Sequence, residues 1–412
     1  MDVKVYPGKL SGKVHIPSSK SIGHRALIAA SLADGNSKIY GVDFSKDIIA
    51  TVEAMRALGA FIDAEKTYLK VRGIAVPKFS ATIDANESGS TLRFLIPVAA
   101  ALGTETLFLG RGRLPKRPIT AYLRELPKKG IKMDYDGGLP LRISGKMQSG
   151  EFVLEGDVSS QYITGLLFAL PICDGNSKII LSSPLQSAPY VALTIRVLNK
   201  FGIKIDKTDY GYFIKGNQSY NPGDIEVEGD YSQAAFYYVA NENGSNIELG
   251  NLFPDSIQGD KAITQIIKDW HEKKISGGKL SFDLDTENIP DLVPILAVLA
   301  TSGNDTSYIR GTDRLRIKES DRIQSTCDMI NSLGGKCTAT NDGLIITPVG
   351  QLNGGTVDSY GDHRIAMAAT IAALNCRNPV NIMDAGVVEK SYPRFFEDII
   401  ELGGKVDGIT LE

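Results

Sequence analysis

Cysteine is scarce in this sequence, and its few copies form no pattern that carries chemistry. The 412 residues include four cysteines, at positions 173, 327, 337 and 376, with no CxxC pair and no neighbouring set of histidines that would complete a metal site. Scattered single cysteines are typical of reduced structural thiols in an intracellular protein. The cysteines therefore predict neither a disulfide framework nor a metal centre.

Long apolar runs are also missing. No window approaches the roughly 18 uninterrupted apolar residues that a membrane-spanning helix needs. The opening residues, Met1 to Val5, are typical of a strand and lack the apolar core of a secretion signal. We therefore expect a cytoplasmic protein without a membrane partner.

The sequence also lacks a large excess of positive or negative charge. Lys and Arg number 45 against 48 Asp and Glu, which leaves a net charge of −3 at pH 7. This balance gives no general basic field for nucleic acid, so any anion site must be a local concentration of cations. The length suggests two or three domains.

One local pattern recurs along the chain, at a period of about 70 residues. A helix-like stretch ends in a glycine and is followed by a strand, a polar turn and a second strand. Glycine suits the helix end because it accepts the left-handed conformation there. The copies end at Gly59, Gly130, Gly202, Gly334 and Gly403. The strand pairs predicted after them are 61–63 with 68–71, 131–133 with 141–143, 203–205 with 212–214, 336–338 with 344–347, and 405–406 with 409–411.

A sixth copy is expected where the spacing doubles. A helix is predicted over Asp260–Trp270 and a strand over Lys279–Leu284. Six units divide as three plus three, and a strand at Met1–Tyr6 would complete the short last unit. We therefore predict one domain over 15–224 and a second, discontinuous one over 1–14 and 225–412. The alternative is two sequential domains with an accidental period.

Eight polar segments stand mostly where a loop leads into an apolar, helix-like run. Free N–H groups at a helix start attract anions. Each segment alone is explained equally well by a capped helix with surface charge, but eight with one placement favour a shared anion-binding cleft between two domains. None is a Walker P-loop, because GxxxxGK[ST] is absent. The segments are Pro17–Leu27, Asn86–Phe94, Gly110–Pro118, Gly156–Tyr162, Asn288–Leu292, Arg314–Arg322, Asp362–Arg364 and Lys390–Arg394.

The segment Arg314–Arg322 is the densest in charge. If it is helical from Ile317, Lys318 and Arg322 share one face at i, i+4. Like charges stacked in this way repel unless an anion or an acidic side chain lies between them. A salt-bridged, exposed helix is the alternative interpretation.

Together the segments resemble the enolpyruvyl transferase family, in the family's order from Ser18 to Phe396. The resemblance is closest to the branch that acts on shikimate 3-phosphate. The implied fold is α/β, with two similar domains of three βαβαββ units each (an inside-out α/β barrel type) joined by a two-stranded hinge. The motifs that carry the resemblance are Ser19-Lys20-Ser21, Ser159-Ser160-Gln161, Lys318-Glu319-Ser320-Asp321-Arg322 and Asp362-His363-Arg364.

The resemblance implies transfer of the enolpyruvyl group of phosphoenolpyruvate to the 5-hydroxyl of shikimate 3-phosphate, with release of phosphate, in chorismate and aromatic amino-acid biosynthesis. It implies no cofactor and no metal. Asp291 is the implied base, with Glu319 and Lys20 as alternative proton donors. Residues implied to bind shikimate 3-phosphate are Lys20, Ser21, Arg25, Ser159, Ser160, Gln161, Ser187, Asp291 and Lys318. Residues implied to bind phosphoenolpyruvate are Lys20, Gly89, Arg117, Gln161, Arg322, Arg364 and Lys390.

Two positions depart from the family pattern, and two other functions compete. Glu87 and Arg314 stand where relatives carry asparagine, so we assign them no role. A UDP-N-acetylglucosamine enolpyruvyl transferase usually has a reactive cysteine in the loop that matches 110–118, and this loop has none. A non-catalytic phosphometabolite-binding protein would not need Asp291, Glu319 and His363. We expect a monomer that closes on its two anionic substrates.

Overall fold

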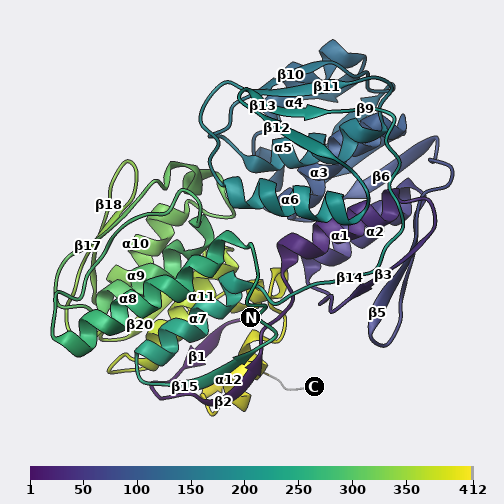
Figure 1. The fold of residues 1–412 in the computed structure, drawn as a ribbon. Coiled ribbons are helices and arrows are strands. Elements are labelled where there is room, and N and C mark those ends of the chain that lie inside the picture. The colour runs from purple at the N-terminus through teal and green to yellow at the C-terminus, as the bar shows by residue number, and fades with distance from the viewer. Residues whose placement is uncertain (410–412) are drawn as a thin grey trace. The chain divides into compact units, whose positions relative to one another are not determined.

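The computed structural model describes residues 1–409, and the chain divides into two compact units (Figure 1). We call Ser18–Glu228 the middle unit, and Met1–Pro17 with the chain from Gly229 onward the terminal unit. The domain boundaries predicted from the sequence fall after residues 14 and 224. Two passages of chain run side by side at the boundary, where Ser19 donates its N–H to the Glu228 carbonyl (2.8 Å) and Asp230 donates to Pro17 (2.9 Å).

The middle unit contains three four-stranded sheets of one design. In each sheet two parallel strands are extended by an antiparallel hairpin, in the orders β14-β3-β5-β4, β6-β7-β9-β8 and β10-β11-β13-β12. The strands are β3 (Asn36–Tyr40), β4 (Phe61–Ala64), β5 (Tyr68–Arg72), β6 (Ser80–Asp84), β7 (Glu105–Leu109), β8 (Lys132–Tyr135), β9 (Leu141–Ser144), β10 (Glu151–Leu154), β11 (Ser177–Leu181), β12 (Ile205–Thr208), β13 (Gly211–Ile214) and β14 (Ile225–Glu226).

Helices fill the interior of the middle unit, and the sheets lie outside them. Nearly all residues of helix α3 are buried, as expected of a helix surrounded by other elements. Strand β5, in contrast, buries Leu69 and Val71 and exposes Lys70 and Arg72, so one face of its sheet meets water. The helices are α1 (Lys20–Leu32), α2 (Lys46–Leu58), α3 (Gly89–Leu102), α4 (Thr120–Glu125), α5 (Ser160–Ala169) and α6 (Ala188–Lys200).

The terminal unit repeats this design with one reduced copy. Its sheets have the orders β16-β17-β19-β18 and β20-β21-β1-β22, and a third sheet has only β15 and β2. The strands are β1 (Val3–Val5), β2 (Ser11–His15), β15 (Asn246–Gly250), β16 (Asp283–Asp285), β17 (Ser307–Arg310), β18 (Lys336–Ala339), β19 (Leu344–Thr347), β20 (Gly355–Asp358), β21 (Val380–Met383) and β22 (Val406–Asp407). The helices are α7 (Tyr231–Glu242), α8 (Ala262–Ser276), α9 (Val293–Thr301), α10 (Arg322–Ser332), α11 (His363–Leu374) and α12 (Phe395–Glu401).

The predicted strand at the start of the chain is confirmed by its pairing. Strand β1 lies between β21 and β22 and runs antiparallel to both, with Val5 opposite Val380 and Val406. The first residues of the chain therefore complete the sheet made by the last ones.

The marker glycines do have the left-handed conformation that the repeat requires. Their φ angles are 120°, 83°, 81°, 83° and 91° at Gly59, Gly130, Gly202, Gly334 and Gly403. Each of the first four is followed by a hairpin, β4–β5, β8–β9, β12–β13 and β18–β19. The strand predicted at 203–205 begins only at Ile205, and the one predicted at 409–411 lies mostly outside the described residues.

The sixth copy has the predicted helix, but its predicted strand over Lys279–Leu284 is mostly absent. Helix α8 ends at Gly277, but no two-stranded hairpin follows it in the described chain, and the predicted strand shrinks to β16, which pairs in parallel with β17. Side chains of the next segment take the place of a partner strand. The N–H groups of Leu280 and Phe282 donate to Asn304 Oδ1 (2.7 Å) and Ser307 Oγ (3.2 Å).

Candidate functional site

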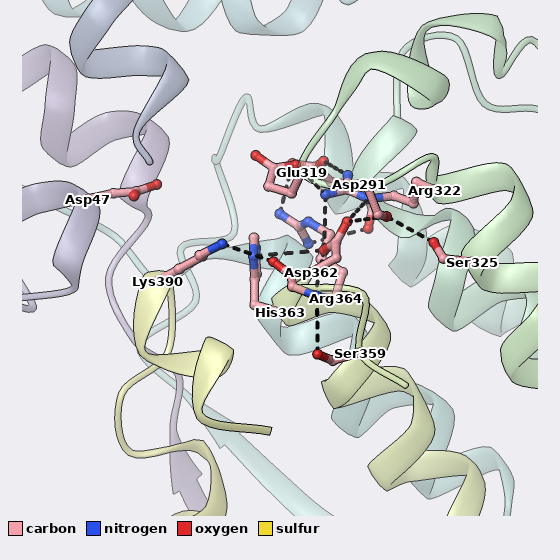
Figure 2. A network of polar contacts seen from close by, with 12 residues as sticks. Asp47, Asp291, Glu319, Arg322, Ser325, Ser359, Asp362, His363, Arg364 and Lys390 are labelled. Carbon is pink, nitrogen blue, oxygen red and sulfur yellow. Dashed lines mark hydrogen bonds and ion pairs between the residues drawn. The ribbon is translucent and has the colours of Figure 1, made fainter. Parts of the chain in front are cut away.

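A cluster of ion pairs surrounds Arg322, at the start of helix α10 in the terminal unit (Figure 2). Only 1% of its side chain is exposed. Its guanidinium donates to Asp291 Oδ1 (2.9 Å), Glu319 Oε2 (2.7 Å) and Asp362 Oδ2 (2.9 Å). A buried cation is tolerated only where counter-charges and hydrogen bonds compensate its lost hydration, and these carboxylates provide both.

A second guanidinium meets the same aspartate from helix α11. Arg364 Nη2 donates to Asp291 Oδ2 (2.8 Å) and to Ser232 Oγ (3.1 Å), and its Nη1 donates to the Asp291 carbonyl (3.3 Å). Asp291 therefore gives one carboxylate oxygen to each arginine, as Figure 2 shows.

The charges of this cluster determine its protonation. Burial alone raises the pKa of Asp291, but Arg364, Arg322 and Lys318 outweigh it and hold that pKa well below the usual range of an aspartate. Burial would lower the pKa of Arg322, but its carboxylate partners Asp362, Glu319 and Asp291 raise it above the ordinary value. Asp291 and Arg322 are therefore both ionised at neutral pH.

Helix starts place these side chains. Asp362 caps α11 by accepting the N–H of Arg364 (3.0 Å), and Asp321 caps α10 by accepting the N–H of Gln324 (3.2 Å). The condition for a shared face, a helix from Ile317, is therefore not met. A 3-10 turn covers Asp313–Ile317, Lys318 is extended, and α10 begins only at Arg322, so Lys318 and Arg322 share no helical face.

Lys390 adds a cation beside the start of α11. It ends a 3-10 turn, Ala385–Lys390, and its Nζ donates to the Gly361 carbonyl (2.9 Å), next to the capping Asp362. His363, the first residue of α11, is also buried. The predicted residues Asp291, Lys318, Glu319, Arg322 and Arg364 meet in this cluster, and Lys390 lies at its edge.

In the middle unit, helix α1 carries three predicted residues, Lys20, Ser21 and Arg25. Lys20 pairs with Asp47 of α2 (2.8 Å), and its side chain keeps 20% exposure. Arg25 is buried and fixed, with bonds to the Ser21 carbonyl (2.6 Å), Thr194 Oγ1 (2.8 Å) and the Tyr190 carbonyl (2.9 Å). Burial lowers the pKa of Arg25 to about 10, so the guanidinium stays charged at neutral pH.

Gly89 and Arg117 are matched in shape. Gly89 is the first residue of α3, and a Cβ built there would lie 2.7 Å from Nη1 of Arg117. Arg117 follows a 3-10 turn, Leu114–Lys116, and is largely buried. The guanidinium therefore lies directly on the helix start, where only glycine leaves room for it.

Helix α5 begins with the predicted Ser159-Ser160-Gln161. The Ser159 hydroxyl caps the helix by accepting the Gln161 N–H (3.3 Å), and Ser160 is its first residue. The Gln161 side chain accepts a bond from Arg93 (2.7 Å) and donates to Ser90 Oγ (3.1 Å), both on α3. The starts of α3 and α5 are therefore adjacent.

A buried chain of hydrogen bonds joins α1 to the start of α3. His24 Nδ1 bonds Thr51 Oγ1 (2.7 Å), Thr51 bonds Thr91 (2.7 Å), and Thr91 donates to Ser88, the cap of α3 (2.7 Å). The first turns of α1, α3 and α5 thus gather at one end of the middle unit, where unpaired N–H groups favour anions.

Ser187 has an unusual backbone. It precedes α6 in the left-handed conformation, with φ 55°, and is buried. Such strain in a residue other than glycine persists only where the surroundings enforce it, and it is concentrated at functional sites.

Some residues in each of the two units that position the predicted side chains were missed from the sequence. Asp362, Ser232, Asp47 and Arg93 hold predicted residues in place, yet nothing but tertiary structure brings them together. Asp362 and Arg93 did stand inside quoted segments, which is the signal that was available. Of the two departures from the family, Arg314 donates to the Glu287 carbonyl (2.7 Å).

Glu87, the other departure, lies against the loop before Arg117. A Cβ at Gly112 would come within 2.6 Å of its Oε2, so this glycine makes room for the carboxylate. This contact explains how the Glu87 side chain is packed, but it indicates no chemical role for it.

Solved structures show that the fold of this chain is a known one. Two structures of EPSP synthase from Acinetobacter baumannii each superpose with a TM-score of 0.80, at 24% and 23% identity, and cover 98% and 100% of this chain and 99% and 100% of theirs. The predicted fold class, α/β with two similar domains, is confirmed.

Sequence comparisons then give the family. The EPSP synthase (3-phosphoshikimate 1-carboxyvinyltransferase) family matches residues 5–399. Relatives named 3-phosphoshikimate 1-carboxyvinyltransferase from Clostridium beijerinckii and Clostridioides difficile are 45% and 42% identical over 427 and 428 residues, with 98% of each chain covered. The chain belongs to the EPSP synthase family.

Residues 1–409 contain neither a membrane-spanning helix nor a cluster of metal ligands. None of the helices in this range is both long and apolar enough to cross a membrane. No group of three or more His, Cys, Asp or Glu side chains in the same range is arranged to hold a metal ion. The expectation that the enzyme works without a cofactor stays a prediction.

Proposed function

We propose that this chain transfers the enolpyruvyl group of phosphoenolpyruvate to the 5-hydroxyl of shikimate 3-phosphate and releases phosphate, a step of chorismate and aromatic amino-acid biosynthesis. One observation carries the proposal from the site. A carboxylate, Asp291, is held between two buried guanidinium groups, those of Arg322 and Arg364. Such a group combines a base with cations that bind an anionic substrate.

The reaction needs two proton transfers in its first step. The 5-hydroxyl oxygen attacks C2 of phosphoenolpyruvate and loses its proton, while the methylene carbon C3 gains one. The product of this step is a tetrahedral ketal phosphate. In the second step C3 loses a proton and the C2–O bond to phosphate breaks, which re-forms the C2–C3 double bond and gives the enol ether. We assign the base to Asp291 and leave Glu319 and Lys20 as alternative donors.

In the terminal unit, we assign Arg322, Arg364 and Lys390 to phosphoenolpyruvate. Their buried positions support this role, because cations fixed in advance stabilise developing negative charge more than mobile ones. Lys318, whose charge acts on Asp291, is assigned to shikimate 3-phosphate together with Asp291 itself.

In the middle unit, the helix starts supply the remaining contacts. The charges, hydroxyls and N–H groups at the starts of α1, α3 and α5 suit phosphate oxygens. We assign Gly89, Arg117 and Gln161 to phosphoenolpyruvate and Lys20 to both substrates. Residues assigned to shikimate 3-phosphate are Lys20, Ser21, Arg25, Ser159, Ser160, Gln161 and Ser187.

The assay for this function is phosphate release from the purified chain. Release should require shikimate 3-phosphate and phosphoenolpyruvate together, and neither alone should suffice. UDP-N-acetylglucosamine in place of shikimate 3-phosphate should give none. Absence of release with the correct pair would remove the proposal.

We further propose a cytoplasmic monomer. Each assigned residue belongs to a single chain, so the reaction needs no second copy. All four cysteines are unpaired and buried, which suits a reducing compartment. Light scattering of the purified protein would show whether its mass in solution is that of one chain.

A further inference from the structure

Two of the arginines assigned to phosphoenolpyruvate, Arg322 and Arg364, have anionic partners within the protein. Arg322 donates to Asp291 and Glu319, and Arg364 donates to Asp291, at 2.9, 2.7 and 2.8 Å (Figure 2). Carboxylates and phosphates seek the same guanidinium N–H groups. A bound phosphoenolpyruvate and these side chains therefore compete for the same cations.

The carboxylates around Arg322 are of two kinds. Asp362 has 0% side-chain exposure, contacts Arg322 through Nε and Nη2, accepts the Ser320 hydroxyl, and caps α11. The side chains of Asp291 and Glu319 keep 22% and 21% exposure. A ligand can reach the second kind, whereas displacement of Asp362 would also break a helix cap.

The ligand-free cluster is balanced by its own acids. Two guanidinium groups so close together and so deeply buried are costly unless an anion lies between them, and Asp291 supplies that anion. The same pairing makes Asp291 a weak base, because the arginines hold its pKa below the usual range. A proton acceptor for the 5-hydroxyl needs the opposite property.

We propose that Asp291 and Glu319 occupy Arg322 and Arg364 as internal anions until phosphoenolpyruvate displaces them, while Asp362 remains as the fixed counter-ion that positions Arg322. This inference rests on the proposed function and concerns the same site. Displacement frees the reacting carboxylates only when the substrate is present. Part of the binding energy of phosphoenolpyruvate is used to break the ion pairs, which lowers its affinity and favours the reactive state.

The test is the affinity of Asp291→Asn for phosphoenolpyruvate. The amide keeps the shape of the side chain and removes its charge, so the internal competitor is weakened. Calorimetric titration of phosphoenolpyruvate, without shikimate 3-phosphate, into the full chain avoids turnover. We expect Asp291→Asn to bind at least about fivefold more tightly than the wild type, the lower end of ordinary coupling between sites. Glu319→Gln should change the affinity in the same direction, because it removes the charge of a second carboxylate that hydrogen-bonds Arg322.

Asp283→Asn is the matched control. Asp283 pairs with Arg310 on the exposed face of the same unit (2.8 Å), so the change removes one negative charge away from the cluster. Its affinity should equal that of the wild type. Equal, weaker or undetectable binding to both Asp291→Asn and Glu319→Gln overturns the inference, as does equal tightening in Asp283→Asn. Phosphate release by the wild type with both substrates tests the proposed function separately. If release occurs but the affinities do not change as expected, only the present inference fails.

Discussion

Gly89 shows how one missing side chain shapes the site at the scale of a residue. The Arg117 guanidinium lies where a Cβ would be, 2.7 to 3.0 Å from its three outer atoms. Because the obstructing group is the end of a flexible side chain, an alanine would displace the guanidinium rather than break the helix. A substitution at Gly89 can therefore move the Arg117 guanidinium, which we assign to substrate binding, without changing the conformation of α3.

We predict that Gly89→Ala leaves the melting temperature nearly unchanged and raises the KM for phosphoenolpyruvate roughly tenfold, as for one weakened ionic contact. Steady-state kinetics with each substrate varied in turn measures this. Gly8→Ala is the matched control, because nothing lies within 4 Å of a Cβ at that position. An unchanged KM in Gly89→Ala would contradict the assigned role of Arg117.

His24 is a second single-residue feature, and it predicts a dependence of stability on pH. Burial, followed by the charges of Lys20 and Arg25, lowers the pKa of His24 well below 6.5. The unfolded chain therefore takes up a proton at a higher pH than the folded one. This contribution to stability is complete above about pH 6.5 and is lost as the pH falls, by up to about 1.4 kcal/mol per pH unit.

Urea unfolding at pH 7.5 and 5.5 tests the titration of His24. The wild type should lose about 1 kcal/mol more between the two pH values than His24→Asn, which cannot titrate there. An equal loss in both proteins would show that His24 is not held neutral.

At the scale of elements, helix starts carry most of the site. Asp362 illustrates why, because one carboxylate both caps α11 and pairs with the first residue of α10. The sequence indicated these junctions through small and charged residues before apolar runs. The sequence did not indicate that α10 begins after Asp321. A helix from Ile317 was equally plausible, and the capping bond from the Gln324 N–H to Asp321 that decides between the two is seen only in the structure.

Two substitutions separate the functions of Asp362. Asp362→Asn keeps an oxygen for the helix cap but removes the charge beside Arg322, whereas Asp362→Ala removes both. We expect the alanine variant to be less stable than the asparagine variant by about 1 kcal/mol, the usual worth of a cap. Both should raise the KM for phosphoenolpyruvate, since Arg322 loses its fixed partner. Urea unfolding and KM measurement check the two parts, and equal stability of the variants would exclude the cap.

At the scale of the whole molecule, the repeat explains how distant residues belong to one enzyme. The marker glycines and polar turns predicted five hairpin units, because both depend on local backbone conformation. The reduced sixth unit was not predictable, since Asn304 and Ser307, which replace a partner strand, act from another part of the chain. The contacts of Asp291 with Arg322 and Arg364 likewise depend on tertiary structure.

Strand β1 completes the last sheet, so a charged side chain on its buried face should lower the stability of the protein. Val5 is fully buried between β21 and β22. Val5→Asp should destabilise the terminal unit by about 4 kcal/mol or more, because a carboxylate is buried without a partner. Lys4→Asp, on the exposed face of the same strand, should cost little. Thermal unfolding of both variants measures the difference, and similar melting temperatures would contradict this strand pairing.

The turnover number of Asp291→Asn tests the central claim most directly. With shikimate 3-phosphate and phosphoenolpyruvate both saturating, phosphate release should fall by about 10²-fold or more, the usual effect of losing a general base. The variant should remain folded, with its melting temperature measured alongside. A turnover number within about twofold of the wild type would contradict the assignment of Asp291 as the base.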